Sequence, residues 1–211
     1  MAGASTTTSM TTNLVRLLQL ASPTLPVGAY SYSQGLEAAV EAGVIRDAAS
    51  AERWIGDVLE FSVARSDVPL LYRMLRGEEC NEEFVASRET AELRAETLQM
   101  GHSLARLLAN LGVHAPEGEM AFPAVYAVAA RAWNIEPRAA LVGYLWGWLE
   151  NQVMAAVKAV PLGQTDGQKM LMALGARLET IDPHTEFSNF APGLAVLSAA
   201  HETQYSRLFR S

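Results

Sequence analysis

Apolar residues recur at spacings of three, four and seven along most of this chain, as they do on one face of an amphipathic helix. The stretch 89–111 is the clearest case, because leucines and a methionine repeat in that way up to Gly112. No run alternates apolar and polar residues convincingly, so the pattern gives no support for a sheet. Proline and glycine divide it into roughly nine to ten helices with short connections. We therefore predict an all-α fold.

The longest apolar stretch, 139–160, reads AALVGYLWGWLENQVMAAVKAV. As a helix it would be about 33 Å long, which is enough to cross a bilayer. Glu150, Asn151 and Gln152 stand in its middle, where one charged side chain costs about 2.5–3.5 kcal/mol in lipid. Apolar residues cover nearly its whole circumference, so it needs neighbours on most sides. We expect it to be the central apolar helix of a single-domain bundle over residues 13–211.

One face of this stretch carries small and polar residues at spacings of four and three: Gly143, Gly147, Asn151, Met154 and Lys158. Glycine inside a helix costs about 1 kcal/mol relative to alanine. Two glycines on one face therefore predict that another backbone packs closely there. That backbone could belong to this chain or to a second copy in a dimer.

Two connections carry the spacing of a capping box, in which a Ser or Thr side chain caps a helix and a Glu or Gln three residues later completes the cap. Ser31 and Gln34 have this spacing, which predicts a helix start there. Thr165 and Gln168 have it too, after a tight turn expected at Pro161–Gly167. That turn follows the central helix directly and offers polar side chains for recognition or for capping.

Composition narrows the class of protein. Half of the 211 residues are apolar, 18% are charged, and the net charge is −7 without a basic stripe, which argues against a nucleic-acid partner. Residues 1–12 are rich in Ser and Thr and lack the features of a secretory signal, so we expect a disordered leader. Cys80 is the single cysteine and can form no internal disulfide, which agrees with a reducing, cytoplasmic location.

Sequence motifs for catalysis or for tight metal binding are absent. None of the four histidines stands in an HExxH or Glu-x-x-His pattern, and there is no GxSxG, P-loop or CxxC. We expect no catalytic residue, no cofactor and no metal ligand set. The alternative is an all-α enzyme that uses His102, His184 or Glu150 in a core pocket.

The last seven residues are of an interaction type. They contain Tyr205, Arg207, Phe209 and Arg210, and aromatic and arginine residues dominate interface hot spots. A terminal segment frays unless it is docked. Composition alone leaves both a frayed helix end and a docked segment open.

Four stretches together resemble the urease accessory protein F family. They read LLQLASPTLPVGAYSYSQGLE (17–37), ETLQMGHSLARL (96–107), AVKAVPLGQTDGQKML (156–171) and AAHETQYSRLFRS (199–211). The resemblance covers nearly the whole chain after the leader, and the first, third and fourth stretches are individually specific.

The resemblance implies an all-α, non-enzymatic homodimer that works as a chaperone in assembling the nickel site of urease. Its implied partners are urease accessory protein D (also called H), the GTPase accessory protein G and apo-urease. The family is thought to regulate that GTPase and to couple GTP hydrolysis to nickel insertion.

The resemblance also implies which residues meet partners. The family's C-terminal segment becomes ordered on binding protein D/H, and the match places this role on Tyr205, Ser206, Arg207, Leu208, Phe209, Arg210 and Ser211. We expect a second contact region, facing the GTPase or supporting the complex, at Glu37, Lys158, Gln164 and Asp166. A structural dimer with no link to nickel is the remaining alternative.

Overall fold

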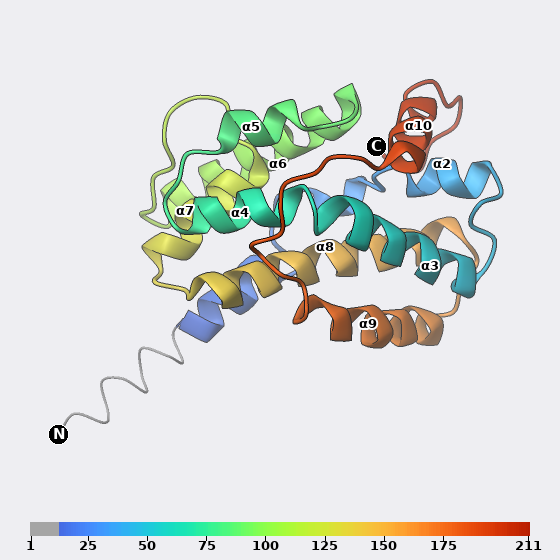
Figure 1. The fold of residues 1–211 in the computed structure, drawn as a ribbon, viewed down its shortest axis with the longest axis horizontal. Coiled ribbons are helices and arrows are strands. Elements are labelled where there is room, and N and C mark those ends of the chain that lie inside the picture. The colour runs from blue at the N-terminus through green and yellow to red at the C-terminus, as the bar shows by residue number, and fades with distance from the viewer. Residues whose placement is uncertain (1–12) are drawn as a thin grey trace.

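The computed structural model describes residues 13–211, and these contain helices and no strand (Figure 1). The leader expected at residues 1–12 lies outside this range. Residues 13–21 are helical. The elements that follow are η1 (Ala29–Ser31), α2 (Leu36–Glu41), α3 (Ala48–Val58), the π-helix η2 (Leu59–Val63), α4 (Asp67–Leu75), α5 (Asn81–Ala86), α6 (Ala91–Asn110), α7 (Phe122–Ala132), α8 (Pro137–Ala159), α9 (Gln164–Leu178) and α10 (Pro192–His201). The predicted all-α fold is confirmed.

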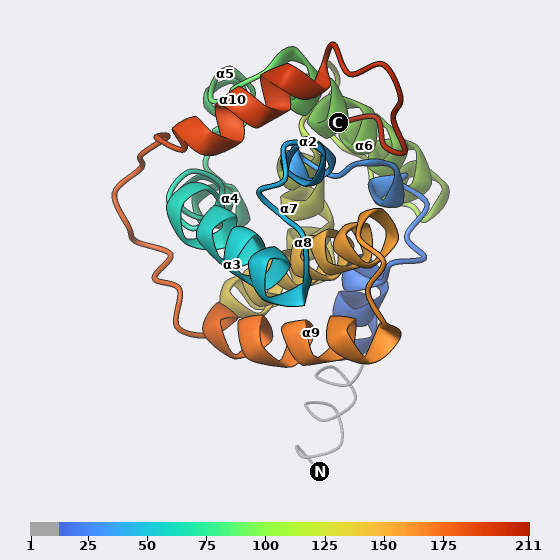
Figure 2. The ribbon, with the colours of Figure 1, turned by 90° about the vertical axis from the view of Figure 1, so that its right-hand side faces the viewer.

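Helix α8 is the centre of the bundle, as its apolar circumference predicted. It contacts α2, α3, α4, α7 and α9, which surround it in the end-on view of Figure 2. Leu141, Leu145, Leu149 and Val153 on α8 are completely buried. Each such side chain contributes about 1.5–3 kcal/mol by leaving water. Within residues 13–211, neither α8 nor any other helix combines the length and hydropathy needed to cross a membrane.

The two glycines of α8 allow the first helix of the same chain, residues 13–21, to pack closely against α8. A Cβ atom at Gly143 would lie 2.5 Å from Leu17 Cδ1, and one at Gly147 would lie 3.7 Å from the carbonyl oxygen of Ala21. The predicted close approach therefore occurs within the chain. The first helix thus accounts for the small residues on this part of the α8 face, and no second copy is needed to explain them.

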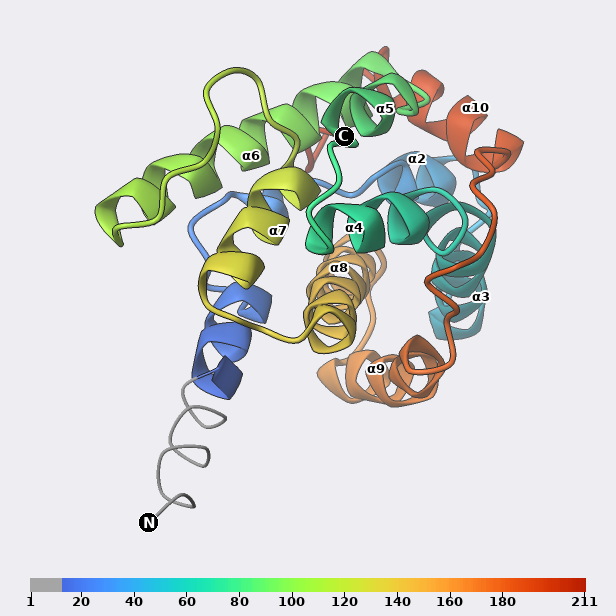
Figure 3. The same ribbon diagram turned by 60° about the vertical axis from the view of Figure 1, so that its left-hand side comes forward.

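The long helix α6 lies beside α7 at the edge of the bundle (Figure 3). The loop between them returns over α6 at Gly101, where an added Cβ would stand 2.0 Å from the Met120 carbonyl oxygen. Helix α10 packs on α2. The buried apolar residues, except Ala38 and Leu93, form one connected cluster.

The predicted capping box at Ser31 and Gln34 is wrong. Gln34 and Gly35 both adopt left-handed backbone conformations, with φ of 54° and 79°, and α2 begins only after them. Ser31 belongs to the short helix η1, and the Gln34 side chain bonds to Glu96 and Trp148 instead of to a helix end. Tertiary hydrogen bonds therefore override the local capping pattern.

The predicted capping box at Thr165 and Gln168 is also wrong, because α9 begins earlier, at Gln164, with Gly163 as its N-cap. The turn expected at Pro161–Gly167 ends before Gln164. Asp166 then lies in the first turn of α9, where a carboxylate is favoured by the partial positive charge of the helix N-terminus.

Candidate functional site

Residues 205–211, here called the C-terminal segment, run back over the bundle and end between α2, α6 and α10 (Figure 2). Its side chains divide into two groups. Phe209 and Ser211 are buried, with exposed fractions of 6% and 1%. Tyr205 and Leu208 point outward, and Tyr205 is fully exposed. The segment is docked and is not a frayed helix end.

The Glu37 carboxylate holds the backbone of this segment. Its Oε1 accepts a hydrogen bond from the Leu208 amide at 2.7 Å, and its Oε2 accepts one from the Phe209 amide at 3.0 Å. The next amide, that of Arg210, donates to the Ser31 carbonyl oxygen at 2.8 Å. Glu37 is itself buried, so these charge-assisted bonds are made away from water.

Ser211 is held by two elements at once. Its carbonyl oxygen accepts from the Ser33 amide at 2.7 Å, from the Ser33 hydroxyl at 2.6 Å and from the Gln34 amide at 3.1 Å. Its hydroxyl donates to Glu96 Oε2 on α6 at 2.7 Å. The polar loop before α2 therefore serves as the receptor for the end of the segment.

Three basic side chains join the segment to its surroundings. Lys158 Nζ, at the end of α8, lies 4.6 Å from the centre of the Phe209 ring, a cation–π distance. Arg207 Nη1 lies 2.5 Å from Glu92 Oε1 on α6. Burial raises the pKa of the Tyr32 phenol, and a hydrogen bond with Arg210 opposes that rise.

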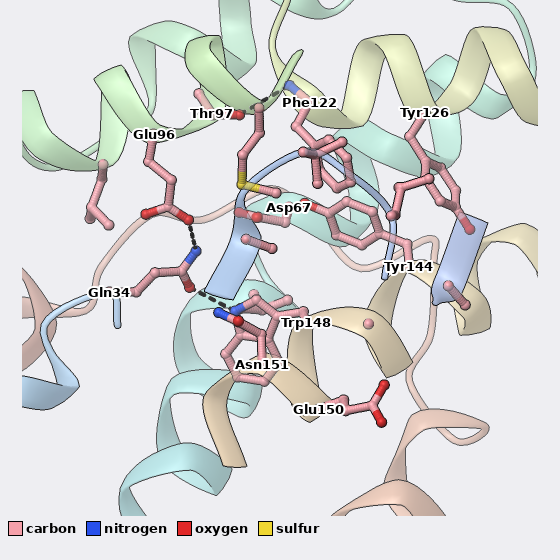
Figure 4. A pocket seen from close by; sticks show the side chains of 18 of the residues that line it. Gln34, Asp67, Glu96, Thr97, Phe122, Tyr126, Tyr144, Trp148, Glu150 and Asn151 are labelled. Carbon is pink, nitrogen blue, oxygen red and sulfur yellow. Dashed lines mark hydrogen bonds between the residues drawn. The ribbon is translucent and has the colours of Figure 1, made fainter. Parts of the chain in front are cut away.

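A cavity of about 320 Å³ lies beside this docking site (Figure 4). Gln34 connects the two: its amide donates to Glu96 Oε1 at 2.6 Å, and its carbonyl oxygen accepts from the Trp148 indole at 2.8 Å. Burial raises the pKa of Glu96 to about 7, although hydrogen bonds from Gln34 and Ser211 act against it. Asp67, which is buried, and Arg88, which is partly buried, form an ion pair at 2.7 Å and also line the cavity.

The residues considered for an enzyme are dispersed. Glu150 lines the cavity, and burial raises its pKa. His102 and His184 are exposed, and His184 packs edge-on against Tyr72. Within residues 13–211, no group of three His, Cys, Asp or Glu side chains is placed to hold a metal ion.

The four residues of the second expected region do not lie together in the structure. Glu37 and Lys158 both contact the C-terminal segment, so they join the first region. Gln164 and Asp166 lie in the first turn of α9, where Asp166 is 3.8 Å from Lys169 Nζ.

Sequence reasoning singled out Glu37 but missed two other buried polar residues around the segment, Glu96 and His201. Glu96 lies on the same face of α6 as Leu93 and Met100, and a charged residue within an apolar stripe was a signal that could have marked it. His201 gave no such signal. Its ring nitrogens lie 2.8 Å from Glu92 and 3.3 Å from Glu37, and these partners stand on other helices.

Comparison with known proteins identifies a family. The UreF family model matches residues 45–175. The urease accessory protein UreF of Azoarcus sp. (strain BH72) is 56% identical over 223 aligned residues, which cover 94% of this chain and 95% of the relative. The protein of the same name from Dechloromonas aromatica (strain RCB) is 53% identical over 222 residues, covering 94% and 97%.

Both matches extend over almost the full length of this chain and of the relative. The chain belongs to the UreF family of urease accessory proteins.

Proposed function

We propose that this protein acts in the cytoplasm as a non-enzymatic scaffold for the insertion of nickel into apo-urease. In this role it forms a homodimer, binds accessory protein D/H and regulates the GTPase accessory protein G. Nickel is the cargo of the assembly and not a cofactor of this chain. The proposal rests on membership of the UreF family and on one structural observation, the docked C-terminal segment.

The segment has the properties of a preformed contact for protein D/H. Its backbone is fixed by Glu37, Ser31 and Ser33, while Tyr205 and Leu208 face outward. Tyrosine and arginine in fixed positions contribute strongly to binding because little side-chain freedom is lost. We therefore place the D/H contact on the outward side chains of the segment.

Binding of D/H by a Tyr205→Ala, Leu208→Ala variant tests this placement. Both side chains are exposed, so the fold should be retained while co-purification with D/H is lost. The matched control is Met172→Ala, Phe190→Ala, which removes two exposed apolar side chains elsewhere. Deletion of residues 205–211 should abolish binding too, with helicity preserved by circular dichroism. Undiminished binding by both altered proteins would refute the placement.

Regulation of the GTPase is proposed for the end of the α8–α9 hairpin. Lys158, Gln164 and the partly exposed Asp166 face solvent there, whereas Glu37 acts by holding the segment. Single substitutions to alanine at these four positions should alter GTP hydrolysis or urease activation in a reconstituted mixture of F, D/H, G, apo-urease and nickel. Normal GTP hydrolysis and activation with all four variants would exclude this region.

The homodimer is proposed to use a surface other than the covered α8 glycines. The first helix exposes Leu14, Val15 and Leu18, which are more than half accessible. A Leu14→Ser, Leu18→Ser variant should shift the mass measured by light scattering from dimer to monomer. A mass identical to that of the unaltered protein would place the interface elsewhere.

A further inference from the structure

His201 is completely buried at the end of α10, between carboxylates from two other helices. Its Nδ1 lies 2.8 Å from Glu92 Oε2 on α6, and its Nε2 lies 3.3 Å from Glu37 Oε2 on α2. Both ring nitrogens therefore face carboxylate oxygens.

The number of protons on the ring decides whether both contacts are favourable. A neutral imidazole has one N–H and one acceptor nitrogen, and an ionised carboxylate can only accept. With a neutral ring, one nitrogen lone pair would face a carboxylate lone pair in a buried site. With an imidazolium ring, both nitrogens donate, and the two carboxylates gain a buried positive charge.

Other charged groups meet the partners of the ring and the segment, among them Glu96, which bonds the Ser211 hydroxyl. Arg207 Nη1 pairs with the second oxygen of Glu92 at 2.5 Å. Glu202, next to His201, turns its Oε1 to the amides of Ala91 and Glu92 at the start of α6. An imidazolium at His201 would, with Arg207, balance the carboxylates of Glu37 and Glu92, whereas a neutral ring would leave two carboxylates with one guanidinium.

The same two carboxylates hold the C-terminal segment. Glu37 Oε2 accepts from the Phe209 amide and lies 3.3 Å from the imidazole Nε2, and Glu92 contacts both the imidazole and Arg207. We propose that protonated His201 locks the C-terminal segment onto α2 and α6, and that loss of its proton releases the segment. We call this contact the latch. It involves the isolated chain alone, so it can be tested without any partner.

Amide hydrogen exchange on the full chain, without partners, tests the latch. The protection of the Leu208 and Phe209 amides, corrected for intrinsic exchange, should fall by roughly tenfold or more from about pH 5 to pH 8, the range of histidine titration. A fall of that size corresponds to the loss of one charge-assisted hydrogen bond. In His201→Gln the protection should be low, and only the smaller pH dependence contributed by Glu96, which bonds Ser211 and has a pKa of about 7, should remain. In His102→Gln, which alters an exposed histidine, it should follow the unaltered protein.

Nuclear magnetic resonance of the imidazole nitrogens in the unaltered protein supplies a measurement that needs no variant. Both nitrogens of His201 should carry protons at low pH, and one proton should be lost over the range in which protection falls. A ring that stays neutral from about pH 5 to pH 8 would overturn the proposal. Protection that does not change with pH, or that changes equally in His201→Gln, would overturn it as well.

Discussion

Glu37 and Phe209 lie 172 positions apart in the chain, yet the Glu37 carboxylate accepts a hydrogen bond from the Phe209 backbone amide at 3.0 Å. Because the bond is made by the main chain of the segment, the outward side chains stay free to contact another protein. The backbone amides of the segment thus hold it on the bundle, while its outward side chains are presented to solvent.

Glu37→Gln should loosen the C-terminal segment without unfolding the bundle. An amide leaves one acceptor oxygen for two backbone donors, and a buried donor left unpaired costs about 1–3 kcal/mol. We expect faster amide exchange at Leu208 and Phe209 and weaker binding of D/H. Glu41→Gln, an exposed position on the same helix, is the control. Equal exchange rates in the two variants would contradict the assigned role of Glu37.

Gly101→Ala and Gly147→Ala should have opposite effects on stability. An alanine Cβ at position 101 would stand 2.0 Å from the Met120 carbonyl oxygen, so the loop over α6 must move, at a cost on the order of 3 kcal/mol. At position 147 the nearest atom is 3.7 Å away, an ordinary contact, and alanine should gain up to about 1 kcal/mol from helix propensity. Urea unfolding of both variants measures the difference.

Glu96 should make the folded state less stable as pH rises. Burial raises its pKa from 4.5 to about 7 in the folded protein, so the folded state holds this proton more tightly than the unfolded state does. The resulting stabilisation is complete below about pH 4.5 and is lost as pH rises to about 7, a change on the order of 3 kcal/mol. Urea unfolding from pH 5 to pH 8 should therefore show a smaller decline in Glu96→Gln. The exposed Glu117→Gln is the control, and equal slopes in all three proteins would contradict this role of Glu96.

Lys158→Gln should separate a structural from a functional role. An exposed cation–π contact contributes about 0.5–1 kcal/mol, so loss of the contact with Phe209 should lower stability only slightly. If Lys158 also meets the GTPase, urease activation should fall much more than stability does. Arg106→Gln, which alters an exposed basic residue on α6, is the control. If urease activation is equal in the two variants, the only role left for Lys158 is its structural contact with Phe209.

The order and extent of the helices followed from local sequence. Apolar spacing and the prolines predicted a central helix over 139–160, and α8 spans Pro137–Ala159. The starts of α2 and α9 could not be obtained in this way. Gln34 adopts its left-handed conformation in a loop whose groups bond to Ser211, Glu96 and Trp148, and those partners are distant in sequence.

The sequence pointed to the C-terminal segment of the candidate site but not to most of the residues that hold this segment. The composition of residues 205–211 and the family resemblance indicated a contact segment, and the structure docks it. Its receptor depends on Glu37, Glu96 and His201, which come from three helices and converge only in the folded chain. No spacing within one helix encodes such a convergence, although Glu96 on an apolar face was a partial signal.

A series of hydrogen-bonded side chains links Ser211 to Trp148, so the fluorescence of this tryptophan can report on the C-terminal segment. Three hydrogen bonds connect Ser211 to Glu96, Glu96 to Gln34 and Gln34 to the indole of Trp148. With the other tryptophans, Trp54, Trp133 and Trp146, replaced by phenylalanine, the emission of Trp148 would register departure of the segment without any attached dye. The release of the segment from the bundle and its return could then be timed in solution.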